Sequence, residues 1–75
     1  MNVAERVGRR LRAARDGRGL TRKQVCDRLG INQASLYRYE SGTSEPALEI
    51  INTLCELYGV SLASVVDLEN AKPAI

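Results

Sequence analysis

One stretch, Thr21–Gly42, constrains the fold of this 75-residue chain more than any other. Its first residue and Gln24 have the spacing of a capping box, in which each side chain bonds the backbone of the other residue. Apolar residues then recur at helical spacing as far as Gly30, where a helix commonly ends in a left-handed residue that glycine adopts at little cost. Asn32 is the candidate cap of a second short helix, which the last glycine of the stretch ends. The stretch therefore predicts two short helices joined by a tight turn.

Two helices joined in this way form a helix-turn-helix, a geometry that can present its second helix to the major groove of DNA. The stretch resembles the Cro/CI-type (xenobiotic-response-element) helix-turn-helix family of phage and bacterial repressors. The resemblance rests on a small residue in the first motif helix, a turn glycine, inward apolar residues and an acidic-x-glycine ending: Cys26, Gly30, Val25, Ile31, Leu36, Tyr39 and Glu40-Ser41-Gly42. It covers about residues 5–67 and implies an all-α, five-helix, lambda-repressor-like domain with the helix-turn-helix at helices two and three.

The rest of the chain fits the same architecture. The expected helices cover residues 3–16, 22–29, 33–40, 47–58 and 62–68. Apolar stripes at three- and four-residue spacing mark the first and fourth of them: Val3, Val7, Leu11 and Ala14, then Leu48, Ile51, Leu54, Cys55 and Tyr58. Ala47 stands where the family often has a capping serine, so this cap is expected to be weaker or to move to Ser44. We expect one DNA-binding domain over residues 1–68 and a C-terminal tail over residues 69–75.

Charge is distributed unevenly along the chain. Residues 1–40 contain ten Lys and Arg against four Asp and Glu, a net charge of +6. Residues 41–75 contain one basic residue against five acidic ones, a net charge of −4. The basic part includes the second motif helix, as expected of a protein that binds nucleic acid. The alternative, a solvated basic face without a partner, has little weight once the motif is considered.

Several other classes of protein find no support in the sequence. The chain has no His, and Cys26 and Cys55 lie at inward helical positions without metal-ligand spacing, so we expect buried thiols, no metal and no cofactor. There is no glycine-rich phosphate loop and no nucleophile–base pair, so no catalytic residue is assigned and an enzyme is the least favoured class. No small-molecule ligand is evident. Charges interrupt the N-terminal sequence and no apolar run could span a membrane, so we expect a cytoplasmic, nucleoid-associated protein.

The resemblance assigns DNA contacts to residues of the motif. The outward residues of the second motif helix are expected to meet base edges: Gln33, Ala34, Ser35, Tyr37 and Arg38. An exposed tyrosine without a role is an equal alternative for Tyr37, and a local capping hydroxyl for Ser35. Phosphate contacts are expected from Arg22, Lys23, Ser41, Thr43 and Ser44. In the family the position of Arg22 often holds a glutamine that bonds a phosphate, whereas Thr43 and Ser44 would act through backbone N–H groups.

Two further expectations concern packing. In the family, an arginine near the end of the first helix pairs with the acidic residue that closes the recognition helix, which here implies an Arg15–Glu40 ion pair; two independent surface charges are the alternative. Family members usually dimerise around the fifth helix, which makes Leu62, Val65, Val66 and Leu68 the candidate dimer interface. Leu62 and Val65 are also candidates for the core, so Val66 and Leu68 are the better interface candidates.

The sequence therefore predicts a sequence-specific DNA-binding transcriptional regulator of bacteria or phage. A repressor that binds an inverted repeat in double-stranded DNA as a homodimer is the leading interpretation. One alternative is an antitoxin that also represses its own operon, with a toxin bound by the acidic part of the chain. Another is a protein-interaction module that has lost DNA binding, against which the arginines of the first three helices argue.

Overall fold

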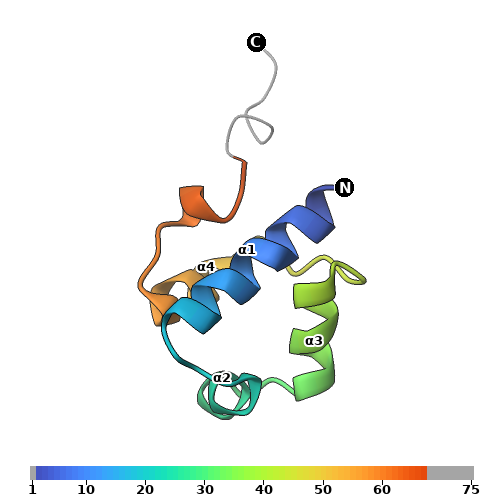
Figure 1. The fold of residues 1–75 in the computed structure, drawn as a ribbon. Coiled ribbons are helices and arrows are strands. Elements are labelled where there is room, and N and C mark those ends of the chain that lie inside the picture. The colour runs from blue at the N-terminus through green and yellow to red at the C-terminus, as the bar shows by residue number, and fades with distance from the viewer. Residues whose placement is uncertain (1, 68–75) are drawn as a thin grey trace.

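The computed structural model describes residues 2–67, and within them four α-helices and one short 3₁₀ helix form the fold (Figure 1). The helices are α1 (Val3–Gly17), α2 (Arg22–Leu29), α3 (Gln33–Ser41) and α4 (Leu48–Tyr58), followed by the 3₁₀ helix η1 (Leu62–Ser64). The described residues contain no strand, so the all-α prediction is confirmed for them. None of their helices has the length and apolar character needed to cross a membrane.

The predicted fifth helix is wrong in its described part, because only η1 forms there. Ser61 caps this turn by accepting from the N–H of Ser64 at 3.2 Å, and the Ser64 hydroxyl donates back to the Ser61 carbonyl at 2.6 Å. Two β-branched valines follow, which favour helix less than unbranched residues do. The chain then turns so that Asp67 reaches α1.

Local caps define both ends of α2 and the start of α3. The Thr21–Gln24 capping box is present, with the Gln24 side chain 2.9 Å from the Thr21 nitrogen and the Thr21 hydroxyl 3.1 Å from the Gln24 nitrogen. Asn32 accepts from the N–H of Ser35 at 2.7 Å and so caps α3. Gly30 ends α2 with a φ of 70°, in the left-handed region expected of it. The sequence thus defined the start and end of α2 and the start of α3 correctly.

The start of α4 has the weak cap that was one of the two expected outcomes, but its first turn is less buried than expected. Ala47 is its N-cap and makes no side-chain capping bond, so the cap is weak and does not move to Ser44. Leu48 was expected in the buried stripe but is 61% exposed, and Val3 in the first turn of α1 is likewise 45% exposed. Helical side chains lean toward the helix N-terminus, so residues of a first turn extend over the preceding chain instead of the core.

The core lies where α1, α3 and α4 meet α2 and the chain around η1. Ten residues form it: Val7, Leu11, Val25, Cys26, Leu36, Ile51, Leu54, Cys55, Tyr58 and Val65. Both cysteines are free thiols within it, and burial raises the pKa of each. α1 crosses the front of α4 and approaches the end of α3 (Figure 1). This close approach requires Gly8, because an added Cβ there would lie 2.6 Å from the Glu40 carbonyl oxygen.

Candidate nucleic-acid interface

α3 is buried along one side and open along the other. Leu36 is fully buried and Glu40 is 7% exposed, and these two residues, four apart, anchor the inner side. The outer side carries most of the predicted base-contacting side chains: Gln33, Ala34, Tyr37 and Arg38 are all exposed. Since the inner side is fixed by packing, the outer side chains are presented on a rigid element.

Ser35 and Arg38 are linked on that outer side. The Arg38 Nη2 donates to the Ser35 hydroxyl at 3.2 Å, and Ser35 itself is half-buried. The capping role belongs to the backbone N–H of Ser35, which donates to Asn32, whereas its hydroxyl accepts from Arg38. The Ser35 hydroxyl can therefore orient the Arg38 guanidinium by accepting from it and can still donate a hydrogen bond to a ligand.

A buried ion pair joins α1 to α3, as the family resemblance implied. The Arg15 Nε donates to Oε2 of Glu40 at 2.7 Å, and the Arg15 Nη2 donates to Oε1 at 3.1 Å. The third guanidinium nitrogen donates to the Leu20 carbonyl at 2.8 Å. The side chains of Arg15 and Glu40 are 8% and 1% exposed, and their hydrogen bond raises the pKa of Arg15. The pair therefore fixes the end of α3 against α1.

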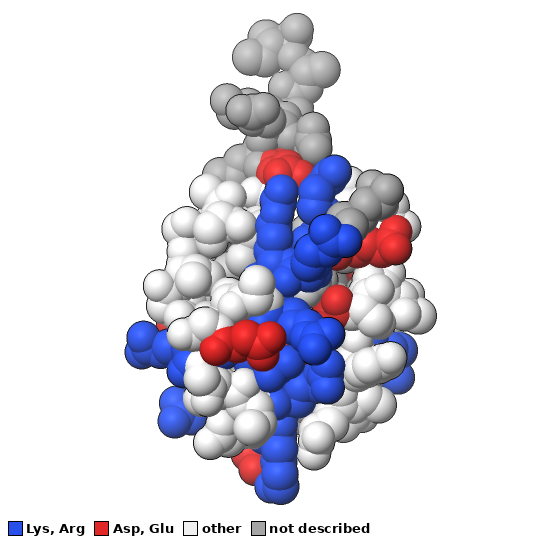
Figure 2. All heavy atoms as spheres, in the orientation of Figure 1, with Lys and Arg blue, Asp and Glu red and all other residues white. Residues whose placement is uncertain are grey.

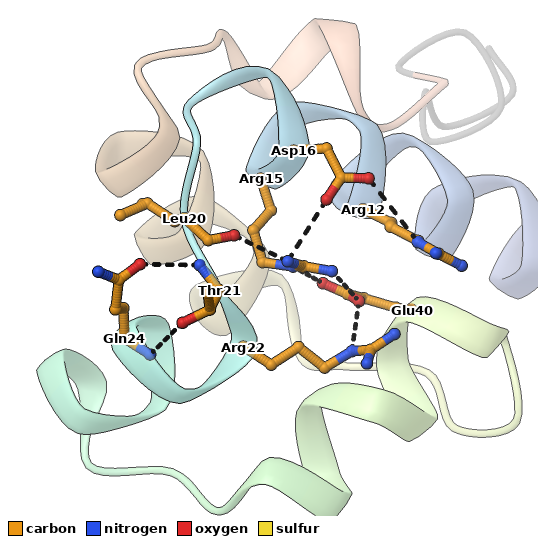
Figure 3. A network of polar contacts seen from close by, with 8 residues as sticks. All are labelled: Arg12, Arg15, Asp16, Leu20, Thr21, Arg22, Gln24 and Glu40. Carbon is orange, nitrogen blue, oxygen red and sulfur yellow. Dashed lines mark hydrogen bonds and ion pairs between the residues drawn. The ribbon is translucent and has the colours of Figure 1, made fainter.

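Glu40 has a second arginine partner that sequence reasoning missed. The Nε of Arg22, the first residue of α2, donates to Oε1 of Glu40 at 2.9 Å. Figure 3 shows the Glu40 carboxylate between the guanidinium groups of Arg15 and Arg22. The Arg22 guanidinium also lies over the Tyr37 ring, 5.3 Å from its centre. No spacing in the sequence links these residues, because the contact depends on how α2 crosses α3.

The other predicted phosphate contacts lie at the surface with partners of their own. Lys23 forms an exposed ion pair with Asp27, 2.8 Å between Nζ and Oδ2, and this contact raises the pKa of Lys23. The N–H groups of Thr43 and Ser44 both donate to the Arg38 carbonyl, at 3.0 and 3.3 Å. The expected phosphate contacts through these two N–H groups are therefore wrong, because both groups already donate to a carbonyl of the chain. The Ser41 hydroxyl donates to the Arg38 carbonyl at 3.2 Å and lies 2.9 Å from the Thr43 hydroxyl, so a phosphate contact from either would have to replace one of these bonds.

Positive charge gathers on the face that carries α1. Figure 2 shows Lys and Arg side chains in a band down the centre of this face, interrupted by acidic side chains. α1 contributes four arginines that are exposed or half-buried: Arg6, Arg9, Arg10 and Arg12. Part of this charge is neutralised locally, because Asp67 lies 2.9 Å from the Arg6 Nε and 2.8 Å from the Arg10 Nη1.

Sequence reasoning also missed the role of Asp67. Arg6 and Arg10 are four residues apart and share one side of α1, a spacing that suits a common acidic partner. The sequence gives no means of choosing that partner. The Arg10 hydrogen bond, with the charges of both arginines, lowers the pKa of Asp67. Arg10 also donates to the Val65 carbonyl at 3.3 Å, so it holds the chain that follows η1.

The candidate dimer residues differ in how deeply the structure buries them. Val65 is 1% exposed and belongs to the core of its own chain, so its assignment to an interface is wrong. Leu62 and Val66 are half-buried and pack against that core with part of their surface open. Leu68 lies outside the described residues.

Residues 2–67 contain no group of three or more acidic, cysteine or histidine side chains that could hold a metal ion. The two thiols are in the core, apart from the polar surface described above. What this surface can offer a ligand is positive charge, hydrogen-bond donors and one aromatic ring.

Comparison with known proteins agrees with this geometry. Antitoxin PezA of Streptococcus pneumoniae is 33% identical over 60 residues, which are 80% of this chain and 38% of PezA. The cryptic phage CTXphi transcriptional repressor RstR of Vibrio cholerae is 33% identical over 57 residues, which are 76% of this chain and 51% of RstR. The chain thus spans about half, or less, of these curated relatives, and no solved structure matches it.

The family model described as the helix-turn-helix domain matches residues 6–68, which is most of the chain. The match includes all four α-helices almost completely, and the similarity to a phage repressor agrees with the Cro/CI-type motif in α2 and α3. The chain therefore belongs to the helix-turn-helix domain family.

Proposed function

We propose that this chain is a sequence-specific DNA-binding transcriptional regulator whose α3 enters the major groove. One observation carries the proposal: α3 exposes its outer side chains while Leu36 and the buried Arg15–Glu40 pair fix its inner side. A rigid helix with an exposed polar face is what direct readout of base edges requires. The positive charge of the first 40 residues supplies the nonspecific attraction to DNA.

The base contacts in this proposal follow from side-chain chemistry. Gln33 can bond the N6 and N7 of adenine, Ala34 can contact a thymine methyl group, and Arg38 can bond the O6 and N7 of guanine. Ser35 and Tyr37 complete the reading surface. Arg22 and Lys23 would bind phosphates by charge. Hydroxyls at the end of α3 and just after it would add neutral hydrogen bonds: Ser41, Thr43 and Ser44.

A homodimeric repressor is the form of regulator that we favour. One short recognition helix buries little surface, and a dimer that spans half-sites roughly 34 Å apart doubles it. Leu62 and Val66 have apolar surface left over after packing on their own core, and Leu68 continues the same segment. The repressor RstR, a relative of this chain, supports repression as the outcome.

Selection of bound duplexes from a random library, at near-physiological salt, tests the proposal. An enriched inverted repeat with half-sites about one helical turn apart is the expected result. Weak, salt-sensitive binding without enrichment would contradict it and would favour a protein-interaction module instead.

Arg38 provides a residue-level test on the selected duplex. Arg38→Ala should relax the preference at one base pair and cost about 1–3 kcal/mol of binding free energy, because a bidentate guanine contact is lost. Arg28→Ala, on the exposed side of α2, is the control and should keep every base preference. Binding titrations against single-base-pair variants provide the measurement. A uniform loss on all duplexes would instead make Arg38 a phosphate contact.

The similarity to antitoxin PezA favours a second candidate, an antitoxin that represses its own operon. The acidic part of the chain, residues 41–75 with a net charge of −4, is the part that we assign to binding a toxin. Co-expression with the protein encoded next to it tests this candidate. Relief of a growth defect by this chain, with co-purification of the two proteins, is the supporting result.

A further inference from the structure

Arg22 makes two contacts that a simple phosphate-binding role does not explain. Its Nε donates to Oε1 of Glu40, and its guanidinium lies over the ring of Tyr37, 5.3 Å from the ring centre. The Glu40 side chain is 1% exposed, the Arg22 side chain is 33% exposed and Tyr37 is 57% exposed. Arg22 therefore connects a buried carboxylate to an aromatic ring on the outer side of α3.

The charges of this cluster do not cancel. Glu40 is shared by Arg15 and Arg22. Asp16 lies 3.4 Å from the Arg15 Nη1 and 3.8 Å from the Arg12 Nε, so three arginines face two carboxylates and one positive charge is in excess (Figure 3). All three nitrogens of the Arg15 guanidinium donate within the protein. Among residues 2–67, the Nη groups of Arg22 have no hydrogen-bond acceptor, so they can donate to an anionic group from outside.

The position of the Tyr37 ring connects the Arg22 guanidinium with the side chains that are proposed to read base edges. Tyr37 lies on the exposed side of α3 with Gln33, Ala34 and Arg38. The guanidinium carbon of Arg22 lies over this ring, 5.3 Å from its centre, and a cation placed over an aromatic ring in this way is attracted to it. Because Glu40 fixes Arg22, this contact restricts the directions in which the Tyr37 side chain can point.

We propose that Arg22 is a positioning residue for Tyr37, and that Tyr37 is a specificity-determining residue. Glu40 orients the Arg22 guanidinium, whose Nη groups bind a DNA phosphate and whose face holds the Tyr37 ring against the edge of one base pair. A thymine methyl group is the partner that suits an aromatic ring in the major groove. This inference rests on the DNA-binding function proposed above.

The experiment uses the full chain and the duplex enriched from the random library, with a panel of its single-base-pair variants. Tyr37→Leu removes the ring, and Arg22→Lys keeps the charge but loses both the Nε donor and the flat face. Tyr37→Leu should flatten the preference at one base pair of each half-site. Arg22→Lys should weaken the preference at that same base pair about three- to tenfold, and adding it to Tyr37→Leu should cause no further loss there.

Two controls separate this role from a general effect on folding or charge. Arg28→Lys is the same substitution at an exposed position of α2 and should leave the preference unchanged. Far-UV circular dichroism establishes that each variant is folded at the temperature of the titration. If Arg22→Lys does not fold, Arg22→Gln, which retains a donor for Glu40, replaces it and should weaken the same preference.

The outcomes distinguish this inference from the function on which it rests. If the Arg22 variant weakens binding equally for all duplexes, or changes a different base pair from Tyr37→Leu, the inference is overturned while the DNA-binding function stands. If the library yields no enriched sequence, the proposed function fails and this inference fails with it.

Discussion

At the scale of single residues, Glu40 is a side chain on which contacts from two other helices converge. It accepts hydrogen bonds from Arg15 and Arg22 and is almost completely buried. A buried ion pair adds little net stability compared with apolar packing, but removal of one partner leaves an uncompensated charge in the interior. Removal of Glu40 is therefore expected to cost more free energy of unfolding than the ion pair contributes relative to apolar packing.

Glu40→Ala should destabilise the fold strongly for this reason. We expect a loss of about 3–5 kcal/mol in the free energy of unfolding, because two guanidinium groups are left facing each other. Glu49→Ala, at an exposed position of α4, is the control and should change it by no more than about 0.5 kcal/mol. Urea denaturation followed by circular dichroism gives both values. Equal effects would mean that the ion pair contributes nothing beyond surface charge.

Gly8 provides a second residue-level prediction. An alanine Cβ at this position would lie 2.6 Å from the Glu40 carbonyl oxygen, so α1 and α3 would have to separate. Gly8→Ala should lower the free energy of unfolding by about 1–2 kcal/mol, since overpacking outweighs the better helix propensity of alanine. Gly17→Ala has open space around its Cβ and should be neutral or slightly stabilising. Stabilisation by both substitutions would contradict the close approach of the two helices.

At the scale of elements, the parts of the fold that depend on neighbouring residues could be predicted from the sequence. The Thr21–Gln24 box, the Asn32 cap and the left-handed Gly30 each involve residues at most four apart. The chain around η1 could not be predicted in this way, because its course depends on Arg10, which contacts it from 55 residues away.

The residues of the candidate site can be separated in the same way, into those placed by local periodicity and those placed by long-range contacts. The exposed side of α3 follows from helical periodicity, and the Arg15–Glu40 pair was carried over from a family pattern. The Arg22–Glu40 bond joins residues 18 apart whose meeting depends on the crossing of α2 and α3, for which periodicity gives no signal. Long-range polar contacts between helices are thus the part of the site that required the structure.

Ala47 gives a prediction at this scale, because α4 begins without a side-chain cap. Its extended backbone, with φ −61° and ψ 150°, is suited to a capping residue. Ala47→Ser should raise the free energy of unfolding by about 0.5–1 kcal/mol, since a hydroxyl can accept from an unpaired N–H of the first turn. The control is Ala13→Ser, at an exposed interior position of α1, which should be slightly destabilising. Thermal unfolding measures the change. An unchanged unfolding temperature for Ala47→Ser would indicate that water already satisfies the N–H groups of this turn.

At the scale of the whole molecule, two polar connections join α1 to distant parts of the chain. The buried one runs from Arg15 to Glu40 at the end of α3, and the half-exposed one runs from Arg6 and Arg10 to Asp67. The first holds the end of α3, whereas the second holds the segment that includes Val66, a candidate for the dimer interface. The basic face of α1 is thus partly used to organise the fold.

The Asp67 connection predicts a dependence of stability on pH. The hydrogen bond from Arg10 and the charges of Arg10 and Arg6 lower the pKa of Asp67 in the folded chain below its usual value of 3.8. A lowered folded pKa means that the stabilisation is complete above the unfolded pKa and is lost as the pH falls through the folded one. The wild-type chain should therefore be more stable than Asp67→Asn at pH 7 and 5, by the same amount at both.

Below pH 4 this difference should shrink, because protonation of Asp67 removes the charge that the variant already lacks. Urea denaturation of both proteins from pH 7 down to pH 2.5 measures it. Asp27→Asn is a matched control, because Asp27 forms an exposed pair with Lys23 within one helix. Its effect on the free energy of unfolding should be smaller than that of Asp67→Asn at pH 7 and 5. A difference between wild type and Asp67→Asn that stays constant to the lowest pH would show that the carboxylate charge does not hold this segment to α1.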